Sequence, residues 1–412
     1  NDGMTDDAPA HISGAEVALR LGVDRARVDE LATAGALASD AEGLFDPGDV
    51  HRVRLLLAFE AAGVPLDALL DASRAGAISL TYYDELHPPP ARLSDRSYAE
   101  FLASLGLGRE SVRRLFAAFG LAEPDAATHL TVADEELIAM MVATAVDTGQ
   151  PDLALRAVRM FGEAARRAAD GALGVYGEAA ARSDEELRGL PIDDLFERRL
   201  RPWARFARVS GTLAAWLMDR HMSRAIDEYS VMETELVLER SGFVPSRLEV
   251  TPAVVFVDLT GFTRMTEERG DDVAAEVAMR LGEVALETVA SRGGRIVKLL
   301  GDGVLVRFDD AVAAADGALD LLVALPRAGL PTAHAGLSAG PLIVREGDVF
   351  GRTVNLAARV ADLTPDGRLF APASVGADLD PDRFRITPAG QSILQGIGSV
   401  ALVDVARAPV SP

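Results

Sequence analysis

The chain has 412 residues, which is too long for one compact domain and predicts two or three. A hydrophobic content of 49% excludes general disorder, and a net charge of −22 argues against nonspecific binding to nucleic acid or anionic lipid. The absence of cysteine excludes disulfides, thiolate metal sites and a cysteine nucleophile, and it fits a cytoplasmic protein. We find no signal peptide and no apolar run near the about 18 residues of a membrane span. Residues 1–10 are expected to form a disordered tail.

Residues 11–75 are predicted to form a domain of short helices, because apolar residues recur there at helical spacing between turn signals. The expected elements are a helix over 14–21, a turn at 22–24, a helix over 25–34, a small wing over 37–45, a helix that begins at Asp46-Pro47 and ends at Gly63, and a helix that begins at Pro65. The first two helices have helix–turn–helix spacing.

Four segments of this domain resemble the N-terminal DNA-binding domain of MerR-type regulators: Glu16-Val17-Ala18-Leu19-Arg20-Leu21-Gly22-Val23, Gly35-Ala36-Leu37, Asp49-Val50 and Ala62-Gly63-Val64-Pro65-Leu66. Where that family usually has a basic-aromatic pair, this chain reads Arg27-Val28-Asp29-Glu30, and residues 11–75 hold eleven acidic against six basic residues. A DNA reader should be basic there. We therefore expect a packing or dimerisation module without DNA binding, and a transcription regulator is the alternative.

Residues 76–200 are predicted to be a linker, as far as Pro90, and then a helical regulatory domain, helical throughout from Ser94 to about Gly189. Thr131 with Asp134-Glu135 predicts a helix start. Apolar residues recur at helical spacing: Leu102, Leu105, Val112, Leu115, Phe116, Phe119, Leu137, Met140, Met141 and Val142. We interpret them as ordinary core, and a pocket for an apolar ligand is the alternative.

Residues 201–245 are predicted to be a connector, with one long helix from Pro202 to about Arg240. Its apolar stripe is loosely heptad-like: Trp203, Phe206, Val209, Leu213, Trp216, Leu217, Ile226, Val231 and Leu238. The stripe favours a dimer-forming connector over one more core helix. His221 within it is interpreted as structural, with a proton sensor as the alternative.

Residues 246–412 are predicted to form an α+β domain, because the periodicity changes to that of strands from residue 252. The expected elements are strands at 253–257, 295–299, 304–308 and 332–338, helices at 271–292, 311–325 and 353–363, and short strands near 368–371, 383–387 and 400–405. Their order is the βαββαβ order of a ferredoxin-like fold, preceded by an all-helical N-terminal region.

Asp258 and Asp302 are the candidate metal ligands. Each lies where an apolar strand meets a tight turn, and an unpaired carboxylate there is costly. One or two Mg²⁺ or Mn²⁺ ions between them would offset that cost. The adjoining turn Thr260-Gly261-Phe262-Thr263 can offer backbone N–H groups to phosphate oxygens. The alternative is a pair of ordinary turn aspartates.

A second group of polar residues strengthens this hypothesis. Lys298 is one cation in an otherwise apolar strand, and Asn355 and Arg359 share a helix face at i and i+4. An amide and a guanidinium on one face can hold a ribose and a phosphate. The alternative is a solvated helix face.

Residues 253–405 closely resemble the class III nucleotidyl cyclase catalytic domain. The resemblance is carried by three segments: Phe256-Val257-Asp258-Leu259-Thr260-Gly261-Phe262-Thr263, Lys298-Leu299-Leu300-Gly301-Asp302 and Asp348-Val349-Phe350-Gly351-Arg352-Thr353-Val354-Asn355-Leu356-Ala357-Ala358-Arg359. It implies three pairs of roles: metal binding by Asp258 and Asp302, purine selection by Lys298 and Asp348, and transition-state stabilisation by Asn355 and Arg359.

The resemblance further implies an adenylate cyclase that converts ATP to 3′,5′-cyclic AMP and pyrophosphate with two metal ions. ATP is expected over GTP, because guanylate cyclases of this family typically have Glu and Cys in place of Lys298 and Asp348. A homodimer with two composite sites is implied, as is regulation by the N-terminal helical region, which resembles that of actinobacterial holo-cyclases and could take a small-molecule or lipid effector. The family's basic residue near the C-terminal strands has no clear counterpart here. A catalytically silent nucleotide-binding signalling protein is the alternative.

Overall fold

The computed structural model describes residues 11–78, 80, 87, 90–106, 108–187, 194, 198, 201–244 and 251–409. The chain divides into two compact units, Asn1–Met232 and Glu233–Pro412. In the described part, no helix combines the length and the apolar character that a bilayer crossing requires. The expected tail at 1–10 and most of the expected linker before Pro90 lie outside the described residues.

The first unit begins with the predicted helix–turn–helix. Its elements are β1 (Ile12–Ser13), α1 (Gly14–Leu21), α2 (Arg25–Thr33), β2 (Leu44–Phe45), α3 (Asp49–Ala61) and α4 (Leu66–Arg74). Of the wing predicted over 37–45, only Leu44–Phe45 is a strand; it pairs antiparallel with β1, and Ser39 forms an isolated bridge to Phe45. Val17, Val28 and Leu56 are fully buried where α1, α2 and α3 meet. The likeness of this domain to MerR-type regulators stays a prediction.

The predicted start of α3, with Asp46 as N-cap and Pro47 as first helical residue, is wrong by two residues. The helix begins at Asp49 and not at Asp46-Pro47. The Asp46 carboxylate accepts a hydrogen bond from the Gly48 N–H at 2.7 Å, and the Asp46 carbonyl accepts one from the Asp49 N–H. Asp46 therefore closes a turn ahead of the helix, which is the other common role of an aspartate before proline.

The next part of the unit is not helical throughout, contrary to the prediction. It consists of β3 (Leu93–Ser97), α6 (Tyr98–Leu105), α7 (Arg109–Phe119), β4 (His129–Thr131), α8 (Val132–Asp147) and α9 (Pro151–Leu187). β3 and β4 pair antiparallel, and each leads directly into a capped helix. Ser97 and Thr131 are the N-caps, in capping boxes with Glu100 and Asp134. An N-cap needs extended backbone, so the two segments before the caps pair as strands. The helix start at Thr131 is confirmed.

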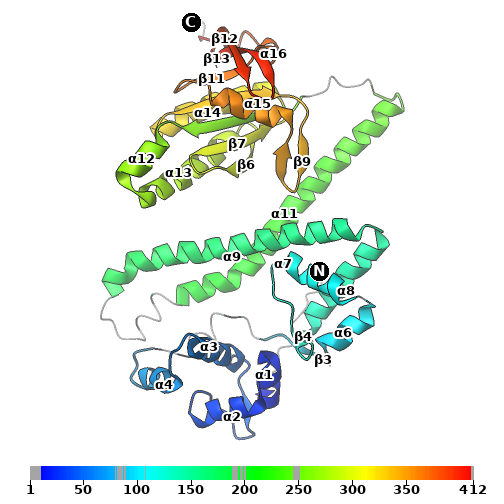
Figure 1. The fold of residues 1–412 in the computed structure, drawn as a ribbon, viewed down its shortest axis with the longest axis vertical. Coiled ribbons are helices and arrows are strands. Elements are labelled where there is room, and N and C mark those ends of the chain that lie inside the picture. Colours follow the sequence, from blue (N-terminus) through cyan, green and yellow to red (C-terminus); the bar gives the residue numbers. More distant parts are fainter. Residues whose placement is uncertain are drawn as a thin grey trace. The chain divides into compact units, whose positions relative to one another are not determined.

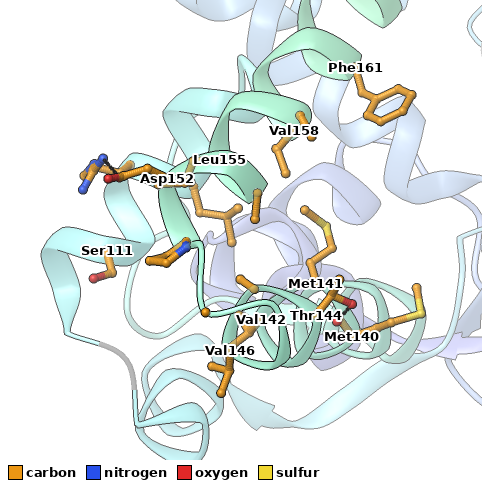
Figure 2. A pocket seen from close by; sticks show the side chains of 17 residues that line it. Ser111, Met140, Met141, Val142, Thr144, Val146, Asp152, Leu155, Val158 and Phe161 are labelled. Atoms are coloured by element: carbon orange, nitrogen blue, oxygen red, sulfur yellow. Dashed lines mark hydrogen bonds and ion pairs between the residues drawn. The ribbon is translucent and has the colours of Figure 1, made fainter. Parts of the chain in front are cut away.

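The expected core of this part is confirmed for α7 but not for all of α8. Val112, Leu115 and Phe116 are buried, whereas Leu137 and Met140 are 49% and 61% exposed. Figure 2 shows Met140, Met141 and Val142 of α8 facing a groove, whose far wall is α9 with Leu155 and Val158. The groove has a volume of about 680 Å³. The core prediction is therefore wrong for Leu137 and Met140.

A helix of 40 residues, α11 (Arg201–Arg240), follows as predicted. Trp203 stacks on Tyr176 of α9 with ring centroids 4.3 Å apart. Ala204 is the one buried residue among those of α11 whose burial is described, and His221 is exposed. Large apolar side chains are exposed along the helix: Phe206, Val209, Leu213, Trp216, Leu217, Met218, Met222, Ile226, Tyr229, Val231, Met232, Leu236 and Val237. Within one chain α11 is therefore not a core helix.

The second unit contains a seven-stranded sheet in the order β12-β13-β11-β8-β5-β7-β6 (Figure 1). Its strands are β5 (Ala253–Leu259), β6 (Arg295–Leu299), β7 (Gly303–Phe308), β8 (Ala333–Ala339), β11 (Leu369–Pro372), β12 (Phe384–Leu394) and β13 (Gly398–Arg407). The helices are α12 (Phe262–Arg269), α13 (Asp271–Ala290), α14 (Ala311–Arg327), α15 (Arg352–Ala361) and α16 (Ala373–Ala377), and β9 (Ile343–Arg345) pairs with β10 (Asp348–Phe350). The expected α+β domain is confirmed.

The two faces of the sheet have separate cores, because successive residues of β5 point to opposite sides. Val255 and Val257 pack in the main core with α13 and α14. Val254 and Phe256 pack in a smaller core with Val354 of α15. We call these the α14 face and the α15 face. A Cβ at Gly336 of β8 would overlap the backbone of α15, so this glycine allows α15 to lie directly on the strand.

Candidate active site

Asp258 lies on the α15 face near the end of β5, between two neighbouring strands. It is paired directly with Gly303 of β7 and with His334 of β8. The Leu259 N–H donates to the Asp302 carbonyl at 2.9 Å, which holds the turn between β6 and β7 against the end of β5. The structure thus brings Asp258 and Asp302 together, as the apolar strand pattern predicts.

The electrostatics of Asp258 indicate an incomplete site. Burial raises the pKa of its carboxyl to about 6, with further contributions from the charges of Asp302 and Asp362, while His334 acts in the opposite direction. A cation beside these carboxylates would remove the repulsion. Among the residues described, no cluster of three or more histidine and acidic side chains could hold a metal alone. Two carboxylates fit Mg²⁺ or Mn²⁺ when substrate phosphates and water supply the other oxygens.

The turn after β5 differs in one respect from the prediction. The Thr260 N–H donates to the Thr332 carbonyl at 2.7 Å, and its hydroxyl donates to Asp366 Oδ1 at 2.8 Å. Thr260 therefore does not present its N–H to a phosphate. Gly261, in left-handed conformation with φ of 73°, is the N-cap of α12 and provides no side-chain cap. The first N–H groups of α12, at Phe262 and Thr263, are the ones placed for an anion.

Lys298 and Asp348 form an ion pair across 50 residues of sequence. Lys298 Nζ donates to Asp348 Oδ2 at 2.6 Å, and this hydrogen bond lowers the pKa of the Asp348 carboxyl. A β-bulge places Lys298: Ile296 is opposite Val306, but Lys298 is opposite Leu305, with Val297 as the extra residue. Because Leu305 belongs to the α15 face, Lys298 lies on that face too.

Asn355 and Arg359 lie on the exposed side of α15, as their spacing predicts. Val354, Ala357 and Val360 are buried beneath them. Arg359 Nη1 is 3.6 Å from Asp362 Oδ2. In the described part of one chain, no hydrogen bond or ion pair joins Asn355 or Arg359 to Asp258 or Asp302. The structure therefore forms each pair of predicted residues but does not link the α15 pair to the aspartates.

Two residues of the site were missed from the sequence. A Cβ at Gly303 would lie 2.8 Å from Asp258 Oδ1, so this glycine makes room for the carboxylate. The Asp302-Gly303 turn was the available signal. His334 Nε2 lies 3.9 Å from Asp258 Oδ2. Only the register between β5 and β8 places His334 there, and no motif of the chain contains it.

Comparison with known proteins gives several relatives, although no family model matches the chain. An adenylate cyclase of Streptomyces coelicolor is 28% identical over 314 residues, which cover 73% of this chain and 75% of that protein. An adenylate cyclase of Streptomyces griseus is 29% identical over 69% of each chain. A pH-sensitive adenylate cyclase of Mycobacterium tuberculosis is 29% identical over 76% of this chain and 78% of its own length.

A crystal structure of the adenylyl cyclase CyaB from P. aeruginosa is 21% identical and has a TM-score of 0.36, covering 39% of this chain and 95% of that chain. The relationship in sequence to the actinobacterial enzymes extends well beyond the three motifs. Together with the motifs around Asp258, Lys298 and Asn355, it supports a class III nucleotidyl cyclase catalytic domain in the C-terminal unit.

Proposed function

We propose that the protein is an adenylate cyclase, which forms 3′,5′-cyclic AMP and pyrophosphate from ATP in a homodimer with two composite sites. The observation that carries the proposal is the Lys298–Asp348 pair, which forms within the same domain that brings Asp258 and Asp302 together. The names of the relatives support the same activity.

The Lys298–Asp348 pair supports adenine as the base. The Lys298 ammonium donates to adenine N1, which is an acceptor, and the Asp348 carboxylate accepts from the 6-amino group. Guanine has a donor at N1 and an acceptor at position 6, so it would meet both side chains with the wrong polarity. An unmatched buried polar contact is costly, and the pair should therefore select ATP over GTP.

Asp258 and Asp302 would hold Mg²⁺ or Mn²⁺, in keeping with the divalent-metal use of class III cyclases. When bound, two such ions would activate the ribose 3′-oxygen and screen the charge of the departing pyrophosphate. The N–H groups at Phe262 and Thr263 bind phosphate oxygens at the start of α12. The aspartates thus fix the triphosphate end of the substrate.

Asn355 and Arg359 act on the ribose and the α-phosphoryl group. Asn355 orients the ribose, and Arg359 stabilises the negative charge that develops on the α-phosphoryl oxygens. The 3′-oxygen forms a bond to the α-phosphorus, and the bond from that phosphorus to the oxygen bridging to the β-phosphorus breaks. The 3′-hydroxyl proton is released to solvent, and pyrophosphate leaves.

The homodimer is inferred from the class III resemblance, which implies that the two aspartates of a site come from one subunit and the Asn355–Arg359 pair from the other. Residues on α15 that are not linked to the aspartates of their own chain can act on the aspartates of a partner. The exposed apolar stripe of α11 supports such pairing, because an isolated helix with this much apolar surface is unfavourable in water. Each chain then contributes to two sites.

Mixed dimers test this arrangement. Asp258→Asn and Arg359→Ala chains should each be inactive as homodimers, but a mixed dimer has one site with both changes and one site with neither. Co-expression at equal amounts should therefore restore about a quarter of the wild-type rate. If each site were built within one chain, mixing would restore nothing.

The direct test is cyclic nucleotide formation by the purified full chain with Mn²⁺ and either ATP or GTP. We expect cyclic AMP as the main product, and Asp302→Ala should abolish it. Wild-type protein that binds Mn²⁺–ATP without forming product would instead support the silent signalling protein.

Regulation by the N-terminal unit is part of the same proposal, with α11 as the connector between that unit and β5. A chain of residues 245–412 should then differ in rate from the full chain. Equal rates for the 245–412 chain and the full chain under all conditions would contradict the regulatory part.

DNA binding is not proposed, because the cations of α2 already form ion pairs within their own domain: Arg25 with Asp29, and Arg27 with Glu30 and Glu60.

A further inference from the structure

Three residues in register form a row across the α15 face of the sheet. Gly303 on β7, Asp258 on β5 and His334 on β8 are directly opposite one another. Residues directly opposite in neighbouring strands point to the same side. The carboxylate of Asp258 therefore has a glycine on one flank and an imidazole on the other.

His334 is not explained by packing. Its side chain is only 18% exposed, and Nδ1 is buried without a hydrogen-bond partner among the described residues. A buried polar atom without a partner costs roughly 1 to 3 kcal/mol. An aliphatic residue would avoid this cost at the same place in the strand. The role of the histidine must therefore come from its other nitrogen, Nε2.

The other nitrogen faces Asp258. Nε2 lies 3.9 Å from Oδ2, which is beyond hydrogen-bond distance, but a small rotation of either side chain would bring the two atoms within it. Nδ1 has no hydrogen-bond partner among the described residues, so a hydrogen on Nε2 is the placement that meets an acceptor. With its hydrogen on Nε2, His334 presents a donor toward the Asp258 carboxylate.

Asp258 needs such a partner because its other neighbours repel it. Asp302 and Asp362 are the nearby charges that oppose its ionised form. Without an attractive group on one side, the carboxylate would be free to turn away from Asp302. On the opposite flank, Gly303 has no side chain, so it leaves room for the Asp258 carboxylate but offers no side-chain group to hold it.

We propose that His334 is a positioning residue, which orients the Asp258 carboxylate so that Asp258 and Asp302 can share a divalent cation. The proposal rests on the proposed metal-binding role of these two aspartates. Groups that orient metal-binding side chains typically contribute 10-fold to 100-fold to metal affinity. His334 would not touch the metal or the substrate itself.

Three variants of the full chain test the proposal. His334→Ala removes the donor, whereas His334→Gln places an amide N–H near the position of Nε2. Ser338→Ala is the matched control, because Ser338 lies on the same face of β8 and its buried hydroxyl also lacks a partner among the described residues. It is paired with Val254 and not with Asp258.

Binding of Mn²⁺ alone is measured from the loss of the free-ion electron paramagnetic resonance signal, and thermal unfolding confirms that each variant is folded. We expect the Kd for Mn²⁺ to rise about tenfold or more in His334→Ala, to stay within about threefold of wild type in His334→Gln, and to be unchanged in Ser338→Ala. The Mn²⁺ concentration for half-maximal cyclase activity should shift in parallel, with little change in the KM for ATP at saturating Mn²⁺.

Equal Mn²⁺ affinity in wild type and His334→Ala would overturn the positioning role, even if both make cyclic AMP. A similar loss in Ser338→Ala would also overturn it, because the effect would then come from the strand as a whole. By contrast, wild-type protein that forms no cyclic AMP with Mn²⁺ and ATP would overturn the proposed function.

Discussion

Asp258 and Asp302 are two like charges held together at the end of neighbouring strands, whereas Lys298 and Asp348 are opposite charges that bind each other. Burial, together with the charge of Asp302, raises the pKa of the Asp258 carboxyl, whereas the hydrogen bond from Lys298 lowers the pKa of the Asp348 carboxyl. We call Asp258 and Asp302 the repelled end of the site, because like charges meet there, and Lys298 and Asp348 the satisfied end, because they already form an ion pair. A cation that binds at the repelled end would remove the repulsion. A purine that binds at the satisfied end must replace the hydrogen bond between Lys298 and Asp348.

The largest expected effect comes from removing one charge at the repelled end. Asp258→Asn should lower the rate of cyclic AMP formation by about 10³-fold or more, because a neutral amide binds a divalent cation poorly. The same change should leave the metal-free protein at least as stable as wild type, since it removes like-charge repulsion. Initial rates and thermal unfolding give both quantities. Asp378→Asn, at the exposed end of α16, is the control and should alter neither. A large loss of stability in Asp258→Asn would break the comparison.

A smaller effect is expected at the satisfied end. Lys298→Ala should lower kcat/KM for ATP by about 10-fold to 100-fold, because one charged hydrogen bond to the base is lost. The kcat/KM for GTP should fall much less, so the ratio of kcat/KM for ATP to that for GTP decreases. Asp348→Asn keeps a hydrogen-bonding group and should have a milder effect than Asp348→Ala. The measurement is kcat/KM for ATP and for GTP with each variant. An equal decrease for the two nucleotides would show that Lys298 and Asp348 do not select the base.

The pH dependence of stability should run in opposite directions for the two pairs. The folded pKa of Asp258 lies above the ordinary 3.8, so its contribution to stability falls as the pH rises from about 4 through about 6. The folded pKa of Asp348 lies below 3.8, so its contribution is present above that value and is lost as the pH falls through the lowered pKa.

Metal-free melting curves should show this as a Tm difference of a few degrees. The Tm of Asp258→Asn should rise relative to that of wild type as the pH is raised from 4 to 7. The Tm of Asp348→Asn should lie below that of wild type by a constant amount over this range, and the difference should shrink only in stronger acid. Saturating Mn²⁺ should reverse the difference between wild type and Asp258→Asn at pH 7. Parallel curves for all three proteins would show that the two ends do not differ as described.

The smallest effect is expected at Thr260, beside the repelled end. Thr260→Val keeps the shape and the backbone N–H but removes the hydroxyl that donates to Asp366. An exposed hydrogen bond of this kind contributes about 1 kcal/mol, so the KM for ATP should rise by no more than about fivefold. Thr260→Ser should restore it. A loss as large as that of Asp258→Asn would mean that the hydroxyl itself binds substrate.

The sequence predicted the aspartate pair because an apolar run that ends in Asp defines both a buried strand and its edge. The Lys298–Asp348 contact was foreseen only through resemblance, since 50 residues separate the two and no periodicity relates them. His334 was invisible, because its place depends on the register between two strands. The pairing of β3 with β4 was missed because strands this short have no repeat to detect, and capped helix starts dominate their pattern.

The bulge in β6 has a consequence for how base selectivity could change in evolution. Residues two apart in a regular strand share a face, so Lys298 would lie with Ile296 on the α14 face if Val297 were not an extra residue. The position of Lys298 beside Asp348 thus depends on one bulge in an edge strand. If Val297 paired regularly with Leu305, with no residue lost, the Lys298 ammonium would lie on the other face of the sheet while every motif stayed intact. A search that matches letters alone would read such a chain as a working cyclase.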